Sequence, residues 1–302
     1  MEIGIKNEKF MEAFDKIWTK PVLNKNKLNL FVLKINANEF NYELLEERLI
    51  DPMINYSVSR MVREKYRDEP GTLSKKARQK FRTIEKNTGE LGELLLYAFL
   101  ESHLKAPKIL SKLEMKTSNN MYVNGSDGVH FLKLDNGNFQ LIFGESKMYQ
   151  RFGTALDQAL ESISNFKVGR NANGDAKTGM QFEKTIISDN LCKEVFSEEE
   201  KNFIESIIYP REDTDFYTDD AFGIFIGYEI NITEEEKMLD NEEFRSKVKR
   251  KIDLQISEQI TKIEEKIKER NLTGHNFYIY VLPFTEIDKK RVEILNEVLS
   301  WV

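Results

Sequence analysis

The sequence predicts an α/β protein, chiefly because of two apolar segments and the helical pattern between them. Residues 221–230 (AFGIFIGYEI) and 277–284 (FYIYVLPF) are almost continuously apolar, as is typical of strands buried on both faces of a sheet. Isoleucines recur every three or four residues over 252–267, which predicts a long amphipathic helix that is most simply part of the core. A strand, a crossover helix and a further strand in this order are the repeating unit of α/β folds.

The N-terminal hundred residues are expected to open with a strand and to continue as helices. Residues 28–36 (LNLFVLKIN) are rich in β-branched and aromatic side chains and predict a strand. Helical spacing then runs up to Pro52. Residues 73–102 predict one long helix or two short ones, with Gly89 and Gly92 as interruptions.

The middle of the chain alternates strands and helices. Asn136 and Gly137 predict a two-residue hairpin turn. Residues 153–167 return to helical spacing. The strand-like segments before that helix are 112–118 (KLEMKTS), 128–135 (GVHFLKLD) and 139–147 (FQLIFGESK). Between residues 89 and 230 the predicted order is therefore helix, three-stranded meander, helix and strand.

No repeat, proline-rich tract or glycine-serine linker divides the 302 residues, which are about twice the usual length of one domain. One body with subdomains is expected. We predict an N-terminal strand and helical extension over 1–88, a core over 89–230, and a C-terminal helix–strand–helix over 231–302 that completes the sheet.

Composition excludes several classes of protein. The longest apolar run, 94–100, has seven residues, too few to cross a bilayer, and the N-terminus lacks the layout of a signal peptide. We therefore expect a soluble cytoplasmic protein with no membrane partner. One cysteine excludes an internal disulfide, and three histidines with no CxxC or HExxH pattern exclude the usual zinc sites. Any catalytic metal must be held mainly by oxygen.

The net charge of −6 argues against a surface that is basic throughout. The segment 75–86 nevertheless holds six basic residues against one acid, and it either contacts nucleic acid or forms the solvated face of a helix. With one lysine from a neighbouring strand end, the candidate nucleic-acid contacts are Lys75, Lys76, Arg78, Lys80, Arg82 and Lys116.

Three charged residues are predicted to meet at the open end of the hairpin. In a two-residue hairpin Asp127 would pair with Ser146, next to both Glu145 and Lys147. Because side chains alternate along a strand, Glu145 and Lys147 share one face and Ser146 lies on the other. Two carboxylates can hold a hard divalent cation, and a lysine can orient or deprotonate an attacking water and steady phosphate charge. This combination suits phosphodiester hydrolysis. His130, three residues after Asp127, is expected to face away from the site and to be packed.

A further acid is expected from the preceding helix. Its apolar residues surround the helix axis, so the helix is largely buried, and a carboxylate there is costly unless it is paired or bound to metal. Glu93 is our candidate and Glu90, one turn earlier, is the alternative. Alternatively, both acids serve only to stabilise the N-terminal end of the helix by interacting with the helix dipole.

A glutamate on a buried helix, Gly125-Ser126-Asp127 before one strand and Glu-x-Lys at the end of the next resemble the layout of the PD-(D/E)XK nuclease superfamily. Here Gly-Ser-Asp replaces the Pro-Asp of the superfamily name and keeps the carboxylate. At a finer level, the chain resembles the HamA nuclease family of the Hachiman anti-phage defence system from Gly89 to about Lys167. The segments that carry this resemblance are GELGELLLYAFLES, LSKLEMKTSNN, NGSDGVHFLKL and FGESKMYQ.

The resemblance implies a PD-(D/E)XK core, with a bacterial DNA endonuclease activity that depends on Mg²⁺ or Mn²⁺. It also implies a superfamily 2 helicase partner, HamB, that restrains the nuclease. Catalytic roles carry over to Glu93, Asp127, Glu145 and Lys147, and metal binding to Asp127, Glu145 and Glu93, or Glu90 in its place. The alternative is a non-catalytic scaffold or DNA-binding subunit whose carboxylates are structural.

Overall fold

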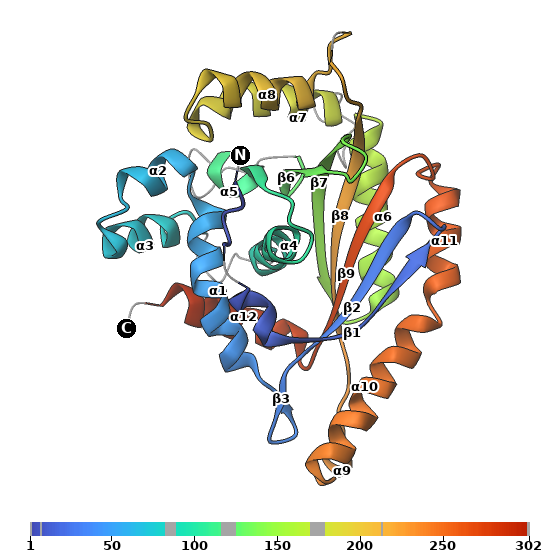
Figure 1. The fold of residues 1–302 in the computed structure, drawn as a ribbon. Helices are drawn as coiled ribbons and strands as arrows, with labels where there is room; N and C mark the ends of the chain where they lie inside the picture. The colour runs from blue at the N-terminus through green and yellow to red at the C-terminus, as the bar shows by residue number, and fades with distance from the viewer. Residues whose placement is uncertain are drawn as a thin grey trace.

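The computed structural model describes residues 2–6, 8–81, 89–115, 125–169, 179–212 and 214–300. Within these residues a seven-stranded mixed sheet runs through the molecule in the order β1-β2-β9-β8-β7-β6-β5, with helices on both faces (Figure 1). The α/β class predicted from the sequence is confirmed. No helix among the described residues is long and apolar enough to span a bilayer.

The four central strands β2, β9, β8 and β7 run parallel, whereas β1, β6 and β5 run antiparallel to their neighbours. The strands are β1 (Phe14–Val22), β2 (Asn26–Leu33), β5 (Lys108–Ser111), β6 (Gly128–Lys133), β7 (Phe139–Tyr149), β8 (Thr218–Glu229) and β9 (Asn276–Phe284). A separate two-stranded hairpin is formed by β3 (Ile35–Asn36) and β4 (Glu39–Phe40).

Figure 1 shows α1, α4 and α12 on one face of the sheet, with α6, α10 and α11 on the other. The longer helices are α1 (Tyr42–Ser57), α3 (Pro70–Arg78), α4 (Glu90–Ser102), α6 (Phe152–Lys167), α7 (Met180–Asn190), α8 (Glu198–Ile208), α10 (Asn241–Ser257), α11 (Ile260–Glu269) and α12 (Ile287–Leu299). The shorter ones are η1 (Lys9–Ala13), α2 (Arg60–Lys65), α5 (Lys112–Met115), η3 (Leu191–Lys193) and α9 (Glu234–Lys237).

Helix α4 packs against β7 and β8, and glycines in these two strands make room for it. A β carbon at Gly144 on β7 would lie 3.1 Å from Leu96, and one at Gly223 on β8 would lie 3.1 Å from Leu100. Twelve of the thirteen residues of α4 are buried, as the distribution of apolar residues all around its axis predicted. The close contact fixes the N-terminal turn of α4 over the end of β7.

Strand β9 lies between β8 and β2, so one sheet takes strands from all three predicted segments of the chain. The N-terminal part of that sheet is larger than predicted. Strand β1 was missed because an edge strand with alternating burial carries Lys, Asp and Pro among its apolar residues (FDKIWTKPV).

The predicted strand at 112–118 is wrong. The strand before β6 is β5 (Lys108–Ser111), and α5 (Lys112–Met115) follows at once, while residues 116–118 lie outside the described part of the chain. A reciprocal capping arrangement explains the early helix: the backbone N–H of Glu114 donates to the Ser111 hydroxyl at 3.3 Å, and that of Ser111 donates to the Glu114 carboxylate at 3.2 Å.

Of two predictions about helix boundaries, one is confirmed and the other is wrong. Over 73–102 the two-helix alternative is confirmed, since α3 ends at Arg78 and α4 begins at Glu90. The single helix predicted over 252–267 is wrong, because α10 ends at Ser257 and α11 begins at Ile260. The break directs α10 against β2, whereas α11 contacts β1 and α6. The isoleucines still face the core.

Candidate functional site

The site lies where β7 extends beyond β6. The register of these two strands ends at the pair Val129 and Phe143, and the backbone N–H of Asp127 donates to the Gly144 carbonyl at 2.8 Å. Strand β8 pairs with β7 as far as Tyr149. On the β6 side, no strand among the described residues pairs with residues 145–149. The backbone of β7 is therefore open on one edge at its C-terminal end.

The hairpin register differs by one residue from the prediction. Leu134 N–H donates to the Asn138 carbonyl at 2.8 Å, so three residues form the turn instead of two, with Gly137 at a φ of 85°. Extending the register of Val129 opposite Phe143 brings Asp127 level with Glu145, so the predicted pairing with Ser146 is wrong. The longer turn could not be distinguished from a two-residue turn, because Asn-Gly suits both.

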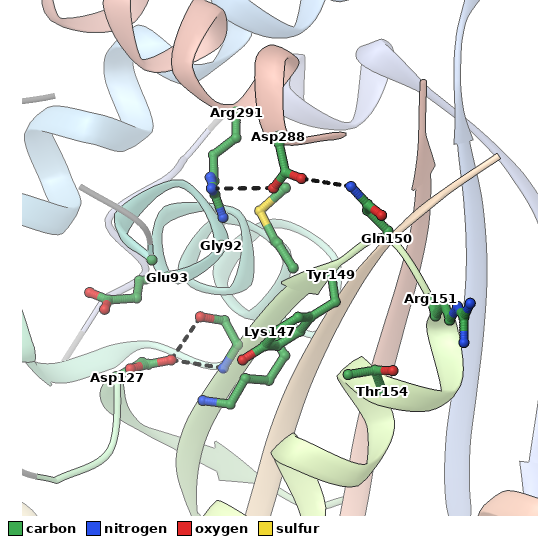
Figure 2. Close-up of a pocket in the computed structure, with 13 residues that line it drawn as sticks. Gly92, Glu93, Asp127, Lys147, Tyr149, Gln150, Arg151, Thr154, Asp288 and Arg291 are labelled. Atoms are coloured by element: carbon green, nitrogen blue, oxygen red, sulfur yellow. Dashed lines mark hydrogen bonds and ion pairs between the residues drawn. The ribbon is translucent and has the colours of Figure 1, made fainter. Parts of the chain in front are cut away.

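Asp127 nevertheless contacts Ser146 through its side chain. Its Oδ2 atom accepts a hydrogen bond from the backbone N–H of Ser146 at 2.7 Å and another from the Ser146 hydroxyl at 2.8 Å (Figure 2). The N–H that would have paired with a longer β6 is thus satisfied by a carboxylate. Asp127 is 7% exposed, so these hydrogen bonds offset part of the cost of burying its charge.

Glu145 and Lys147 share one face of β7, as predicted. Lys147 Nζ lies 2.5 Å from Glu145 Oε1, and both side chains are mostly covered. Their face is that of Phe143, whose ring contacts Phe166 of α6 with centroids 5.2 Å apart. Ser146 lies on the other face: a β carbon at Gly92 of α4 would lie 3.2 Å from its hydroxyl. The open edge of β7 therefore presents an ion pair toward α6 and a serine toward α4.

The structure places Glu93, and not Glu90, at the site. Glu93 lines the same pocket as Asp127 and Lys147, and its Oε2 atom accepts a hydrogen bond from the Tyr56 hydroxyl at 2.8 Å. Tyr56 is fully enclosed, and burial together with the charge of Glu93 raises the pKa of its hydroxyl far above the ordinary value. Glu90 is 4% exposed and does not line the pocket.

The pocket that these residues line has a volume of about 860 Å³ and is built by segments far apart in the sequence (Figure 2). Helix α12 supplies a wall that the sequence reasoning missed. Asp288 on α12 accepts hydrogen bonds from Gln150 at 3.0 Å and from Arg291 at 3.4 Å. Nothing in the local sequence of α12 marks these residues, which reach the site only through the fold.

A second missed residue is Glu183, which holds the loop before Asp127. Glu183 on α7 is 2% exposed; its carboxylate accepts from the Ser126 hydroxyl at 2.6 Å and from the Ser126 backbone N–H at 3.2 Å. In a sequence, an acid in the first turn of a helix ordinarily indicates only an interaction with the helix dipole. The local sequence therefore gives no sign that Glu183 binds Ser126, which lies 57 residues earlier in the chain.

The donor set suits a hard divalent cation. Asp127, Glu145 and Glu93 offer carboxylate oxygens, the ligands that Mg²⁺ prefers, and Mg²⁺ is usually held by one or two carboxylates together with waters and substrate phosphates. Within the described residues, no three Asp, Glu, His or Cys side chains form a group that would hold a metal ion by themselves. Of these three carboxylates, Asp127 and Glu93 line the pocket and Glu145 does not. Two carboxylates in one pocket fit the usual protein share of a Mg²⁺ site, in which waters and substrate phosphates supply the other oxygens.

The remaining sequence candidates lie elsewhere. Lys76 and Lys80 line a different pocket, and Lys75 and Arg78 are on α3 beside it. Arg82 and Lys116 lie outside the described residues. His130 is buried with Nδ1 2.9 Å from the Ala106 carbonyl oxygen, and burial lowers its pKa to about 4. The prediction that His130 is packed is confirmed.

Comparison with known proteins gives one family. The HamA family model matches residues 8–298, nearly the whole chain. No curated protein matches the chain.

Proposed function

The chain belongs to the HamA family, a component of the Hachiman defence system, and from this membership and the site geometry we propose that it is a metal-dependent DNA endonuclease of the PD-(D/E)XK type. It would hydrolyse phosphodiester bonds as the effector of an anti-phage complex. One observation carries the proposal: Asp127, Lys147 and Glu93, from three separate segments, line one pocket at the open edge of β7.

The proposed roles follow from the chemistry of each group. Asp127, Glu145 and Glu93 would hold Mg²⁺ or Mn²⁺, with Asp127 oriented by Ser146. An ion held by these residues would supply Lewis-acid polarisation of a phosphoryl oxygen and a more acidic water. Lys147 orients the attacking water or contacts the phosphate, and its ion pair with Glu145 keeps the ammonium beside the carboxylates. Arg291, on the opposite wall, adds a second cation for the DNA backbone.

DNA and a HamB-like superfamily 2 helicase are the proposed partners. A chain with net charge −6 binds free DNA weakly, and that binding weakens further with salt. A helicase partner that holds DNA would supply the affinity that this surface lacks. It would also give control over when cleavage begins.

The second candidate function is a non-catalytic subunit with a nuclease fold. The observation that favours it is that Glu145 does not line the pocket of Asp127 and Glu93 and is ion-paired with Lys147. In that case the ion pair between Glu145 and Lys147 would be structural. Metal binding separates the two candidates: a catalytic site requires that Mg²⁺ or Mn²⁺ raise the melting temperature of the wild-type protein but not of Asp127→Ala.

The main experiment is cleavage of plasmid and linear DNA at low salt with Mg²⁺ or Mn²⁺, by the purified chain alone and with its candidate helicase. EDTA and Glu145→Ala should each abolish cutting, and Lys147→Ala should reduce it by about 10²–10⁴-fold. Lys133→Ala, an exposed lysine on β6, serves as the matched control and should cut normally. Absence of metal-dependent cutting by the folded chain, with and without the helicase, would overturn the proposal.

A further inference from the structure

A second pocket, of about 530 Å³, lies between the end of α1, helices α2 and α3, and the turn after α7. It shares no lining residue with the pocket at β7. Its volume is within the range of small-molecule sites. Figure 1 shows α2 and α3 beside α1, away from the open edge of β7. This pocket is therefore a separate feature of the molecule.

Four lysines from three segments converge on this pocket: Lys65, Lys76, Lys80 and Lys193. None of them forms an ion pair with a carboxylate among the described residues. Lys76 lies over the ring of Tyr66, with Nζ 4.8 Å from the centroid, and Lys193 Nζ donates a hydrogen bond to Asn190 Oδ1 at 2.8 Å. Because like charges around one opening repel each other, an anion in the pocket would be favoured.

Glu194, a buried residue that also lines the pocket, has unused hydrogen-bonding capacity among the described residues. It is 1% exposed, and its Oε2 atom accepts from the Arg60 backbone N–H at 3.2 Å. Its Oε1 atom has no hydrogen-bond partner among the described residues, although a buried oxygen without a partner is costly. Within the lining of this pocket, Glu194 is therefore the side chain with capacity for a further hydrogen bond to a bound group.

The neighbours of Glu194 favour its neutral form. Glu114, which also lines the pocket, is paired with the buried Lys108. Burial, followed by repulsion from Glu114, raises the pKa of Glu194 to about 8. This direction favours the protonated carboxyl, which can donate one hydrogen bond and accept another. A neighbouring donor and acceptor pair is the pattern that the edge of a nucleobase presents.

Val58, Val62, Leu110 and Tyr66 also line the pocket and give it an apolar surface. A ligand that fits this pocket has an anionic end, a flat or apolar body and a polar edge opposite the anion. We propose that the pocket binds a nucleoside phosphate, with the phosphate on the lysines and the base edge on Glu194. The ligand is either a free nucleotide or the phosphorylated end of a nucleic-acid strand, since both carry the same groups.

The test uses the full chain in EDTA at low salt, so that it does not depend on metal or on nuclease activity. Calorimetric titration with nucleoside mono- and triphosphates should give saturable binding. A short oligonucleotide with a 5′-phosphate, compared with the same strand without it, distinguishes a strand end from a free nucleotide. Inorganic phosphate and pyrophosphate are the controls for an anion that lacks a base.

Two sets of variants test the contacts. The double change Lys76→Ala and Lys80→Ala should weaken binding at least tenfold, whereas Lys75→Ala, an exposed neighbour on α3 outside the pocket, should leave it within about twofold. Glu194→Gln keeps a neutral donor and acceptor but changes their positions, so it should alter the preference among bases more than the affinity for pyrophosphate.

A measurement on the wild-type protein covers the case in which a variant fails to fold. Bound nucleotide should protect Lys76, Lys80 and Lys193 from acetylation and leave Lys75 reactive. The proposal is overturned if pyrophosphate binds as tightly as every nucleotide, or if neither nucleotides nor phosphorylated strands bind. It is also overturned if binding is unaffected by the loss of Lys76 and Lys80. None of these outcomes bears on cleavage at β7.

Discussion

The Asp127 carboxylate accepts two hydrogen bonds from Ser146, one from the backbone and one from the hydroxyl. The backbone N–H belongs to the unpaired edge of β7, so the carboxylate occupies the position at which a longer β6 would have continued the sheet. The acid is thereby fixed in orientation by main-chain geometry and not only by side-chain packing. The position of the site along β7 is therefore set by the point at which the pairing of β6 with β7 ends.

Ser146→Ala should lower metal affinity only modestly. The hydroxyl contact is lost, while the backbone N–H still orients Asp127, so we expect a reduction of about tenfold, at the low end for changes to a residue that orients a metal ligand. The measurement is Mn²⁺ titration followed by calorimetry. Asp127→Asn is the reference and should abolish binding. Equal losses in the two variants would contradict the orienting role of the hydroxyl.

Lys147→Ala should reduce cleavage by about 10²–10⁴-fold if the lysine assists attack on the phosphate. Stability should change by less than about 1 kcal/mol, because ion pairs with some solvent access contribute little. Cleavage rates and urea unfolding of the same preparation separate the two effects. A loss of activity that only follows a loss of folded protein would count against a catalytic role.

Tyr56→Phe should destabilise the protein by about 0.5–1.5 kcal/mol, since it removes the hydrogen bond to Glu93 and keeps the ring. Tyr97→Phe is a matched control, because Tyr97 is equally buried and its hydroxyl has no hydrogen-bond partner among the described residues. That control should be neutral or stabilising. Chemical denaturation of both variants gives the comparison, and equal effects would show that the contact with Glu93 contributes nothing.

Glu183→Ala should cost about 1–3 kcal/mol, because it leaves the buried Ser126 donors without their acceptor. It should also weaken metal binding, since the loop before Asp127 loses its attachment to α7. Gln181→Ala, an exposed change on the same helix, is the control for effects on α7 itself. Hydrogen exchange at 125–128 should rise in Glu183→Ala only; unchanged protection there would contradict the attachment.

Stability should fall with rising pH through the titration of Glu194. Its pKa is raised from 4.5 to about 8, so between these values the folded protein holds a proton that the unfolded chain has released. The contribution is fully present below about pH 4.5 and is lost as pH rises through 8, with a slope of at most about 1.4 kcal/mol per pH unit. Glu194→Gln should remove this slope. Urea unfolding at pH 6 and pH 8.5 tests it, and parallel losses in both proteins would refute it.

The fold class and the central strands followed from the sequence because continuous apolar runs and helical isoleucine spacing depend on local residues alone. Strand β1 and helix α5 did not follow. β1 is an edge strand whose polar residues resemble a loop, and α5 depends on a hydrogen-bond exchange between Ser111 and Glu114 that competes with strand pairing.

At the site, the shared face of Glu145 and Lys147 followed from strand alternation. The hairpin register did not, because one extra turn residue changes which residues lie opposite each other. Arg291 and Glu183 could not be predicted at all, since each reaches the site from a helix more than fifty residues away in the chain. Long-range contacts of this kind leave no local pattern.

The order of the strands also constrains when the protein can become functional. Strand β9 lies between β8 and the pair formed by β1 and β2. These two strands therefore cannot join the rest of the sheet until the ribosome has synthesised β9, which ends at residue 284. Helix α12, with Asp288 and Arg291, follows still later. A nascent chain therefore has no complete pocket at β7, whatever part of it has already folded. The wall formed by α12 is the last part of the pocket to be translated, so the cell that makes the protein is not exposed to a complete site before translation ends.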